Sequence, residues 1–345
     1  MKLQVHGLVH VFTEAEIKAA REQGRLLSLD LELTKRCNLR CIYCYADGGT
    51  PNPDELSLDE IYGTLDAAKA LGARKVTFTG GEPLTHHHFF DIAEYATEAG
   101  LQVSLYTNGT LIDSEVAEKL ADFGVFPCVK LDAVQADIQD TLAGVNGAFA
   151  SIMRGIENLM QVGYGTKYQM NINTVICKLN LENLPQVWGW ARERNIQPSF
   201  LRLGPKGRAN GGDLAVSASE LKALFDELSK MDRGLGGERW NATTPFCGRG
   251  CNKHYISCYV SSTGVVQPCT GVDVPAGNVR EDSLRNMLES SEVFKIARNM
   301  EDHIKGACSI CEHLGKCYGC RGLAFYMNGD FTGADPLCWN NPEAL

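Results

Sequence analysis

The chain has 345 residues, and its 33 Lys and Arg against 42 Asp and Glu give a formal net charge of −9 at pH 7. This length allows about two domains with a substantial core, and the acidic balance excludes a broad basic surface for nucleic acid or anionic lipid. The N-terminus lacks the pattern of a signal peptide, and no run approaches the roughly 18 apolar residues of a membrane span. We therefore expect a cytoplasmic protein without a nucleic-acid or membrane partner.

From residue 28 onward, six β-type runs alternate with helical patterns. The runs cover residues 28–34, 75–79, 102–107, 128–133, 168–176 and 198–203, and the helical patterns cover residues 57–72, 89–100, 116–124, 149–163, 184–195 and 221–228. Six β-helix units predict an α/β protein with a parallel sheet covered by helices. Periodicity leaves open whether this sheet forms a partial barrel or an open, doubly wound sheet.

A Gly-rich stretch near residue 232, RGLGGERW, marks the end of this pattern, and nine of the fourteen cysteines follow it. We therefore divide the chain into an N-terminal segment at 1–28, an α/β domain at 29–235 and a smaller cysteine-rich domain at 236–345. Disulfide frameworks belong mostly to short secreted chains, so this number of cysteines indicates metal binding.

Three cysteines, Cys37, Cys41 and Cys44, follow the first β-type run in the sequence CNLRCIYC. They are expected at the carboxyl end of the sheet, where parallel α/β folds place their ligand sites. A structural zinc ion requires four protein ligands. Three thiolates on a four-iron cluster instead leave one iron open, so a small molecule can bind there.

Two further motifs accompany this triplet: GGEP at residues 80–83 ends the second run, and YTNGT at residues 106–110 ends the third. With Tyr43 before the third cysteine, the chain resembles the radical S-adenosylmethionine (SAM) superfamily. The resemblance implies a partial (β/α)6 TIM-like barrel and a [4Fe-4S] cluster chelated by SAM. One-electron cleavage of SAM, with flavodoxin or ferredoxin as the electron donor, would give a 5′-deoxyadenosyl radical that takes hydrogen from the substrate.

The same resemblance implies the SAM contacts. Tyr43 is expected near the adenine, the GGE residues near the methionyl amino group, and Asn173 near the ribose. Many relatives bind the carboxylate with an arginine after the fourth strand, where this chain reads LAGVNG, so Arg202 is the substitute; a structural salt bridge explains Arg202 equally well. No catalytic acid or base is assigned. The expected SAM-binding residues are Tyr43, Gly80, Gly81, Glu82, Asn108, Asn173 and Arg202.

The C-terminal cysteines include two CxxC pairs, which are typical of a zinc ribbon, but only five residues separate the pairs here. This spacing favours iron-sulfur clusters, and the block resembles the SPASM domain, the auxiliary-cluster extension of radical SAM enzymes. The resemblance implies two auxiliary clusters, and hence three [4Fe-4S] clusters in all. Their ligands would be Cys247, Cys251, Cys269 and Cys320 for the inner cluster, and Cys308, Cys311, Cys317 and Cys338 for the outer cluster.

Three cysteines lie outside these sets. Cys128, Cys177 and Cys258 are expected to be buried apolar residues, although Cys258 competes with Cys247 as an inner ligand. The histidines at 86–88 are interpreted as the first turn of a helix rather than as catalytic residues.

The resemblance leaves three functions to consider. The first is oxidative modification of a ribosomally made peptide or protein, helped by a separate leader-peptide recognition protein because the N-terminal segment is short. The second is oxidation or decarboxylation of a tetrapyrrole side chain, a small-molecule substrate, because CRGLAFYMNGDFTGADPLC resembles the haem-biosynthetic branch. The third is a non-catalytic iron-sulfur electron carrier, which the intact GGEP and TNG motifs disfavour. Thr270 directly after Cys269 disfavours the sulfatase-maturating branch, which has an aspartate there.

Overall fold

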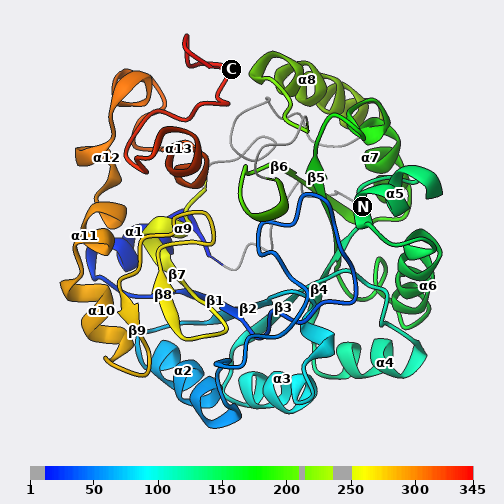
Figure 1. Cartoon of the computed structure of the whole chain (residues 1–345), viewed down its shortest axis with the longest axis horizontal. Helices are drawn as coiled ribbons and strands as arrows, with labels where there is room; N and C mark the ends of the chain where they lie inside the picture. Colours follow the sequence, from blue (N-terminus) through cyan, green and yellow to red (C-terminus); the bar gives the residue numbers. More distant parts are fainter. Residues whose placement is uncertain (1–11, 210–213, 236–250, 345) are drawn as a thin grey trace.

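The structure is a computed structural model that describes residues 12–209, 214–235 and 251–344. Strands lie on the inner side of an arc, and helices cover its outer side (Figure 1). The strands are β1 (Ser28–Glu32), β2 (Lys75–Thr79), β3 (Gln102–Thr107), β4 (Phe126–Lys130), β5 (Asn171–Ile176), β6 (Gln197–Arg202), β7 (Ser257–Val260), β8 (Val265–Gln267) and β9 (Gly277–Asn278).

Some helices begin at side-chain caps that the sequence provides. The predicted capping boxes at Ser57 and Ser217 are both formed, and Asp91 pairs with His88 at the start of the helix that follows the three histidines. No helix in the described ranges is both long enough and apolar enough to cross a membrane. The α-helices are α1 (Glu14–Glu22), α2 (Leu58–Ala70), α3 (Phe89–Glu98), α4 (Ser114–Asp122), α5 (Ala136–Ala143), α6 (Ala148–Gln161), α7 (Leu184–Glu193), α8 (Ala218–Gly234), α9 (Lys253–Ile256), α10 (Leu284–Ser290), α11 (Glu292–Arg298), α12 (Met300–His303) and α13 (Arg321–Asn328).

The six predicted strands form one parallel sheet in the order β6-β5-β4-β3-β2-β1. The order follows the sequence without a reversal, and the helices lie along the outside of the arc (Figure 1). A doubly wound sheet has a point at which the strand order reverses. The structure therefore confirms the α/β prediction and selects the partial barrel.

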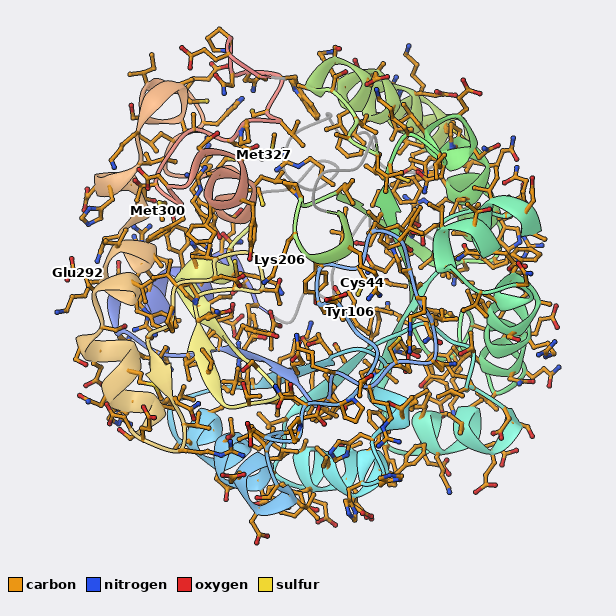
Figure 2. All side chains as sticks on the ribbon, viewed as in Figure 1. Cys44, Tyr106, Lys206, Glu292, Met300 and Met327 are labelled. Carbon is orange, nitrogen blue, oxygen red and sulfur yellow. The ribbon has the colours of Figure 1, made fainter. Side chains whose placement is uncertain are left out.

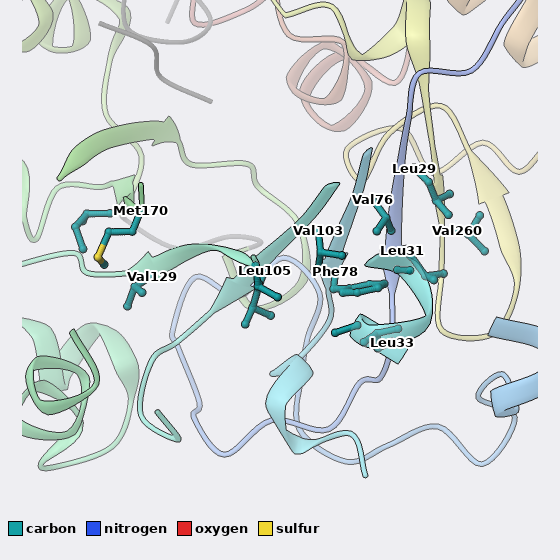
Figure 3. Close-up of a cluster of buried hydrophobic side chains, with 14 of the residues drawn as sticks. Leu29, Leu31, Leu33, Val76, Phe78, Val103, Leu105, Val129, Met170 and Val260 are labelled. Atoms are coloured by element: carbon teal, nitrogen blue, oxygen red, sulfur yellow. The ribbon is translucent and has the colours of Figure 1, made fainter. Parts of the chain in front are cut away.

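Residues along each strand alternate between the two faces of the sheet. The outward face is apolar, and Leu29, Leu31 and Phe78 pack there into the main core (Figure 3). The inward face is polar: Asp30 aligns with Thr77, and Thr77 with Ser104. This alternation places a hydrophobic layer under the helices and directs the polar side chains toward the barrel axis.

The C-terminal part continues the same sheet. Strand β7 pairs in parallel with β1, and β8 and β9 follow as antiparallel neighbours. Helices α10 and α11 lie outside these strands (Figure 1). The sequence predicts none of these three strands, because each has at most four residues and their periodicity is too short to recognise.

Candidate functional site

The loop after β1 carries the cysteine triplet and is held by backbone hydrogen bonds. The N–H of Cys37 donates to Gly49 O at 3.0 Å, and the N–H of Cys44 donates to Cys41 O at 3.2 Å. Burial raises the pKa of Cys41 to about 12, and the charges of Asp132, Cys44 and Cys37 act in the same direction. The three thiols therefore lie close enough to affect one another, as a shared cluster requires.

Two glycines let neighbouring loops approach this cysteine loop. A Cβ on Gly81 of the GGEP motif would lie 2.3 Å from Arg36 O. Gly144 has φ +67°, and a Cβ there would lie 2.3 Å from Arg40 O. Because neither contact tolerates a side chain, the sequences GGEP and LAGVNG fit closely against the backbone on both sides of Cys37 and Cys41.

Glu82 joins the ends of β2 and β3. Its fully buried carboxylate accepts hydrogen bonds from the Thr107 hydroxyl at 2.8 Å, from the Asn108 N–H at 2.6 Å and from the Leu84 N–H at 3.1 Å. Burial raises the pKa of Glu82 to about 7, although these hydrogen bonds favour the ionised form. The side chain thus holds GGEP against TNG, and the Asn108 side chain reaches the cysteine loop through Asn38 at 2.8 Å.

Tyr43 is buried beside the cysteines, and its hydroxyl donates to Asp132. Asp132 also pairs with Lys130 at 2.7 Å and accepts the Val175 N–H at 2.8 Å. No pattern in the sequence identifies Asp132, which lies just after β4, as a residue of the site. Its partners come from three different strands or loops, so only the folded chain brings them together.

Two buried polar atoms on the inward face have no hydrogen-bond partner among the described residues: Asn173 Oδ1 and Thr79 Oγ1. Buried polar groups are nearly always hydrogen-bonded. Asn173 lies opposite Lys130 in the β4–β5 register. A bound polar cofactor such as SAM could provide the missing hydrogen-bond partners of these atoms. The residues at the inward face therefore fit SAM.

Arg202, at the end of β6, forms an ion pair with Asp335 at 2.8 Å, and both side chains are buried. The sequence analysis gave Arg202 two equal interpretations, a SAM contact or a structural salt bridge. The observed geometry favours the salt bridge, because both terminal nitrogens of the guanidinium donate to the Asp335 carboxylate.

Three of the four cysteines predicted for the inner auxiliary cluster lie in the described part of the chain, and they are neighbours. Burial raises the pKa of Cys269 to about 12, and Cys320 and Cys251 contribute to the rise. Nε2 of His254 lies 3.4 Å from Cys269 Sγ. The fourth predicted ligand, Cys247, lies outside the described residues.

The outer auxiliary cysteines form a second group. Burial raises the pKa of Cys317, and the charges of Cys338 and Cys308 add to this effect. Cys311 follows Cys308 at the end of a short 3₁₀ turn, and its N–H donates to Cys308 O. Cys308 and Cys338 are thus neighbours of Cys317, and the assignment of Cys317 and Cys320 to different clusters stays a prediction.

The remaining cysteines are buried apolar residues, as expected: Cys128, Cys177 and Cys258 are at most 3% exposed. Cys258 packs into the main core with the outward-facing residues of the sheet, so its position gives it no place in the inner group. Among the described side chains, no three His, Cys, Asp or Glu residues converge as a single metal ion requires.

Comparison with known proteins agrees with this geometry. The family model "Radical SAM superfamily" matches residues 31–187, and the model "Iron-sulfur cluster-binding domain", SPASM, matches residues 251–320. An AdoMet-dependent heme synthase of Methanosarcina barkeri is 33% identical over 342 residues, which cover 90% of this chain and 95% of that protein. This chain belongs to the radical SAM superfamily. It is a radical SAM enzyme with a SPASM domain, so iron-sulfur clusters and SAM binding are implied.

Other radical SAM proteins are similar over most of their length. The mycofactocin maturase MftC of Mycolicibacterium smegmatis is 31% identical, covering 92% of this chain and 84% of that protein. Streptococcus suis SuiB bound to its precursor peptide SuiA has a TM-score of 0.71 at 19% identity, covering 94% of this chain and 79% of SuiB. The enzyme anSMEcpe with bound AdoMet and a peptide has a TM-score of 0.66 at 18% identity, covering 86% of this chain and 90% of that chain. At these identities the two structures support the fold.

Proposed function

We propose that this radical SAM enzyme oxidises a ribosomally made peptide or protein, using three [4Fe-4S] clusters. The observation that supports SAM cleavage is the arrangement of Cys37, Cys41 and Cys44 beside GGEP and TNG, with the unpartnered Asn173 Oδ1 facing inward. The two auxiliary cysteine groups suit a reaction that removes electrons from the substrate.

The residues of the chain have separate tasks in this proposal. Cys37, Cys41 and Cys44 hold the N-terminal cluster and leave one iron for SAM, and bound SAM supplies the hydrogen-abstracting radical chemistry. Asn173 offers its carbonyl oxygen to the ribose. Glu82 keeps GGEP in place, so that the glycine backbone faces the methionyl amino group.

We assign the acceptance of the proton that accompanies oxidation to the carboxylate of Asp273. Its carboxylate accepts hydrogen bonds from Lys206 at 2.5 Å and from the Tyr326 hydroxyl. Lys206 also donates to Thr270 O at 3.2 Å, next to the inner ligand Cys269. Lys206 lies near the middle of the ring in Figure 2, as does Cys44. Thr270 stands where the sulfatase-maturating branch has its aspartate, and Asp273 supplies a carboxylate three residues later.

The relatives support two substrate classes. Mycofactocin maturases at 29–31% identity support a peptide substrate. Heme synthases at 31–33% identity support the second candidate, a tetrapyrrole. We expect flavodoxin or ferredoxin as the electron donor and a cytoplasmic location, and a separate leader-peptide recognition protein if the substrate is a peptide.

The test is an anaerobic assay of reconstituted enzyme with dithionite and SAM. Three clusters predict about twelve iron and twelve sulfide per chain, and SAM cleavage predicts 5′-deoxyadenosine. Cys41→Ala should lose cleavage and about four irons while it keeps the auxiliary clusters. Iron near four per chain together with bound zinc would contradict the cluster assignment.

The substrate class is tested with two probes in the same assay. One is a precursor peptide encoded beside the gene, and the other is iron coproporphyrin III. A mass change in the peptide alone supports the first class, and a mass change in the porphyrin alone replaces it with the second. An Asp273→Asn variant that modifies the active probe at the normal rate would remove Asp273 from the mechanism.

A further inference from the structure

Arg321, the residue after Cys320, is a buried cation that forms no ion pair with any described carboxylate. Its side chain is 1% exposed. Nη1 donates to the backbone oxygens of Phe331 at 3.1 Å and Gly333 at 2.5 Å, but Nε and Nη2 have no acceptor among the described residues. An uncompensated buried charge costs several kcal/mol in general, so this guanidinium requires an anionic partner.

The surroundings of Arg321 are the two auxiliary cysteine groups. A Cβ on Gly319 would lie 2.8 Å from Arg321 Nη2, and the Gly319 N–H donates to Cys317 Sγ at 3.3 Å. The same Cβ would lie 3.1 Å from Asp335 Oδ2, and the Asp335 N–H donates to Cys308 Sγ at 3.4 Å. The free nitrogens of Arg321 therefore lie close to the outer cysteines, and Gly319 leaves the room that they occupy.

The nearest carboxylate is already engaged. Asp335 accepts hydrogen bonds from both terminal nitrogens of Arg202 and from the N–H groups of Cys320 and Leu337. No ion pair joins Asp335 to Arg321 in the described structure. By contrast, a [4Fe-4S] core of charge 2+ with four thiolates has a net charge of 2−, and its sulfurs accept hydrogen bonds that set the reduction potential.

We propose that Arg321 is the resident counter-cation of the outer auxiliary cluster, to whose sulfurs Nε and Nη2 donate hydrogen bonds. Positive charge beside the cluster stabilises its reduced form, in which the core passes from 2+ to 1+ by uptake of one electron. The substrate supplies that electron. Arg321 thereby makes the outer cluster a better electron acceptor. This inference rests on the proposed presence of the two auxiliary clusters.

The experiment measures the midpoint potential of the outer cluster by EPR-monitored titration, in a Cys41→Ala background that removes the N-terminal cluster. Arg321→Gln should lower the potential by about 59 mV or more, a tenfold loss in the equilibrium constant for electron uptake. Arg321→Lys should keep most of the wild-type potential, because it keeps the charge. Arg298→Gln is the control: it removes another arginine with a buried, unpartnered Nη2, although its side chain is only half-buried and lies near Cys258.

An unchanged potential in Arg321→Gln at full iron content would overturn the proposal, as would an equal shift in Arg298→Gln. If Arg321→Gln does not retain the outer cluster, the midpoint potential of Arg321→Lys is the deciding measurement. A near-normal potential in Arg321→Lys supports the proposal. A potential lower by a tenfold loss in the equilibrium constant for electron uptake, although the charge is retained, contradicts it. Iron near four per chain in the wild type would instead contradict the proposed cluster count.

Discussion

Arg202 and Asp335 join the sixth strand of the barrel to cysteines of both auxiliary groups. The guanidinium and the carboxylate meet at 3.1 and 2.8 Å, with side chains 3% and 0% exposed. Asp335 also accepts the Cys320 N–H at 2.7 Å, and its own N–H donates to Cys308 Sγ at 3.4 Å. Asp335 thus joins Cys320 and the barrel through its carboxylate, and Cys308 through its backbone N–H.

We predict that Asp335→Asn destabilises the fold and releases auxiliary iron. Breaking a buried ion pair costs about 3–5 kcal/mol because the remaining charge stays buried. The check is urea unfolding together with iron analysis. Cys37, Cys41 and Cys44 are untouched, so SAM cleavage should persist.

The exposed pair of Lys222 and Asp226 on α8 provides the control for this prediction. Asp226→Asn should cost about 0–1 kcal/mol, because solvent screens both charges. Equal unfolding energies for the Asp335 and Asp226 variants would show that the buried pair has no special role.

Cys320 and Cys317 provide a second, paired prediction. Cys320 lies with Cys251 and Cys269, whereas Cys317 lies with Cys308 and Cys338. Cys320→Ala should therefore remove the inner cluster and stop substrate turnover, while SAM cleavage without substrate continues. Cys317→Ala should remove the outer cluster and leave the inner one.

EPR spectra of the two variants check this assignment, because each should lose a different reduced signal. An electron-density map of the loaded enzyme provides the independent test. Loss of the same signal in both variants, or a map with Cys317 and Cys320 on one cluster, would refute the assignment of these two cysteines to different clusters.

Gly144 and Gly147 test how closely the LAGVNG loop supports the cysteine loop. Both are left-handed, with φ +67° and +80°, but only at Gly144 would a Cβ meet Arg40 O. Gly147→Ala should cost about 1–2 kcal/mol from the backbone conformation alone. Gly144→Ala should cost about 1–3 kcal/mol more, because the overpacked contact displaces the loop.

The same pair should differ in SAM cleavage. Displacement of the backbone between Cys37 and Cys41 impairs the N-terminal cluster, so Gly144→Ala should lose cleavage while Gly147→Ala keeps it. Both variants are compared by iron content and by 5′-deoxyadenosine yield. Equal losses would mean that the loop conformation, and not the contact with Arg40, is what matters.

The sequence is sufficient to predict the six β-helix units because its information there is local, whereas the closure of the sheet into a partial barrel is implied only by the family resemblance. Alternation along each run, helix caps and glycine stops specify six β-helix units, and the motifs at the strand ends gather on one side of the sheet. The partners of Tyr43 and Arg202 are not local: Asp132 is 89 residues from Tyr43, and Asp335 is 133 residues from Arg202. The pairing of β7 with β1 joins residues that are still farther apart in sequence, such as Ser28 and Ser257. Such contacts depend on tertiary packing, which no periodicity encodes.

Glu82 provides a prediction about pH. The pKa of Glu82 is about 7 in the fold, against an ordinary value of 4.5. Between these two values the folded state binds more protons than the unfolded state, so the free energy of unfolding falls as the pH rises from 4.5 to 7. The raised pKa corresponds to about 3 kcal/mol, which is lost in full above pH 7.

Glu82→Gln removes this titration, at the cost of a mismatched amide among three donors, about 1–3 kcal/mol. The variant should therefore be less stable than the wild type near pH 5, and the deficit should shrink or reverse by pH 8. Urea unfolding at both pH values, in samples of matched iron content, measures the difference. Glu118→Gln is the control, because Glu118 is an exposed residue of α4 and its removal should leave the pH dependence as in the wild type. Parallel pH profiles for the wild type and Glu82→Gln would show that the carboxylate is ionised in the fold, held by the donors of Thr107, Asn108 and Leu84.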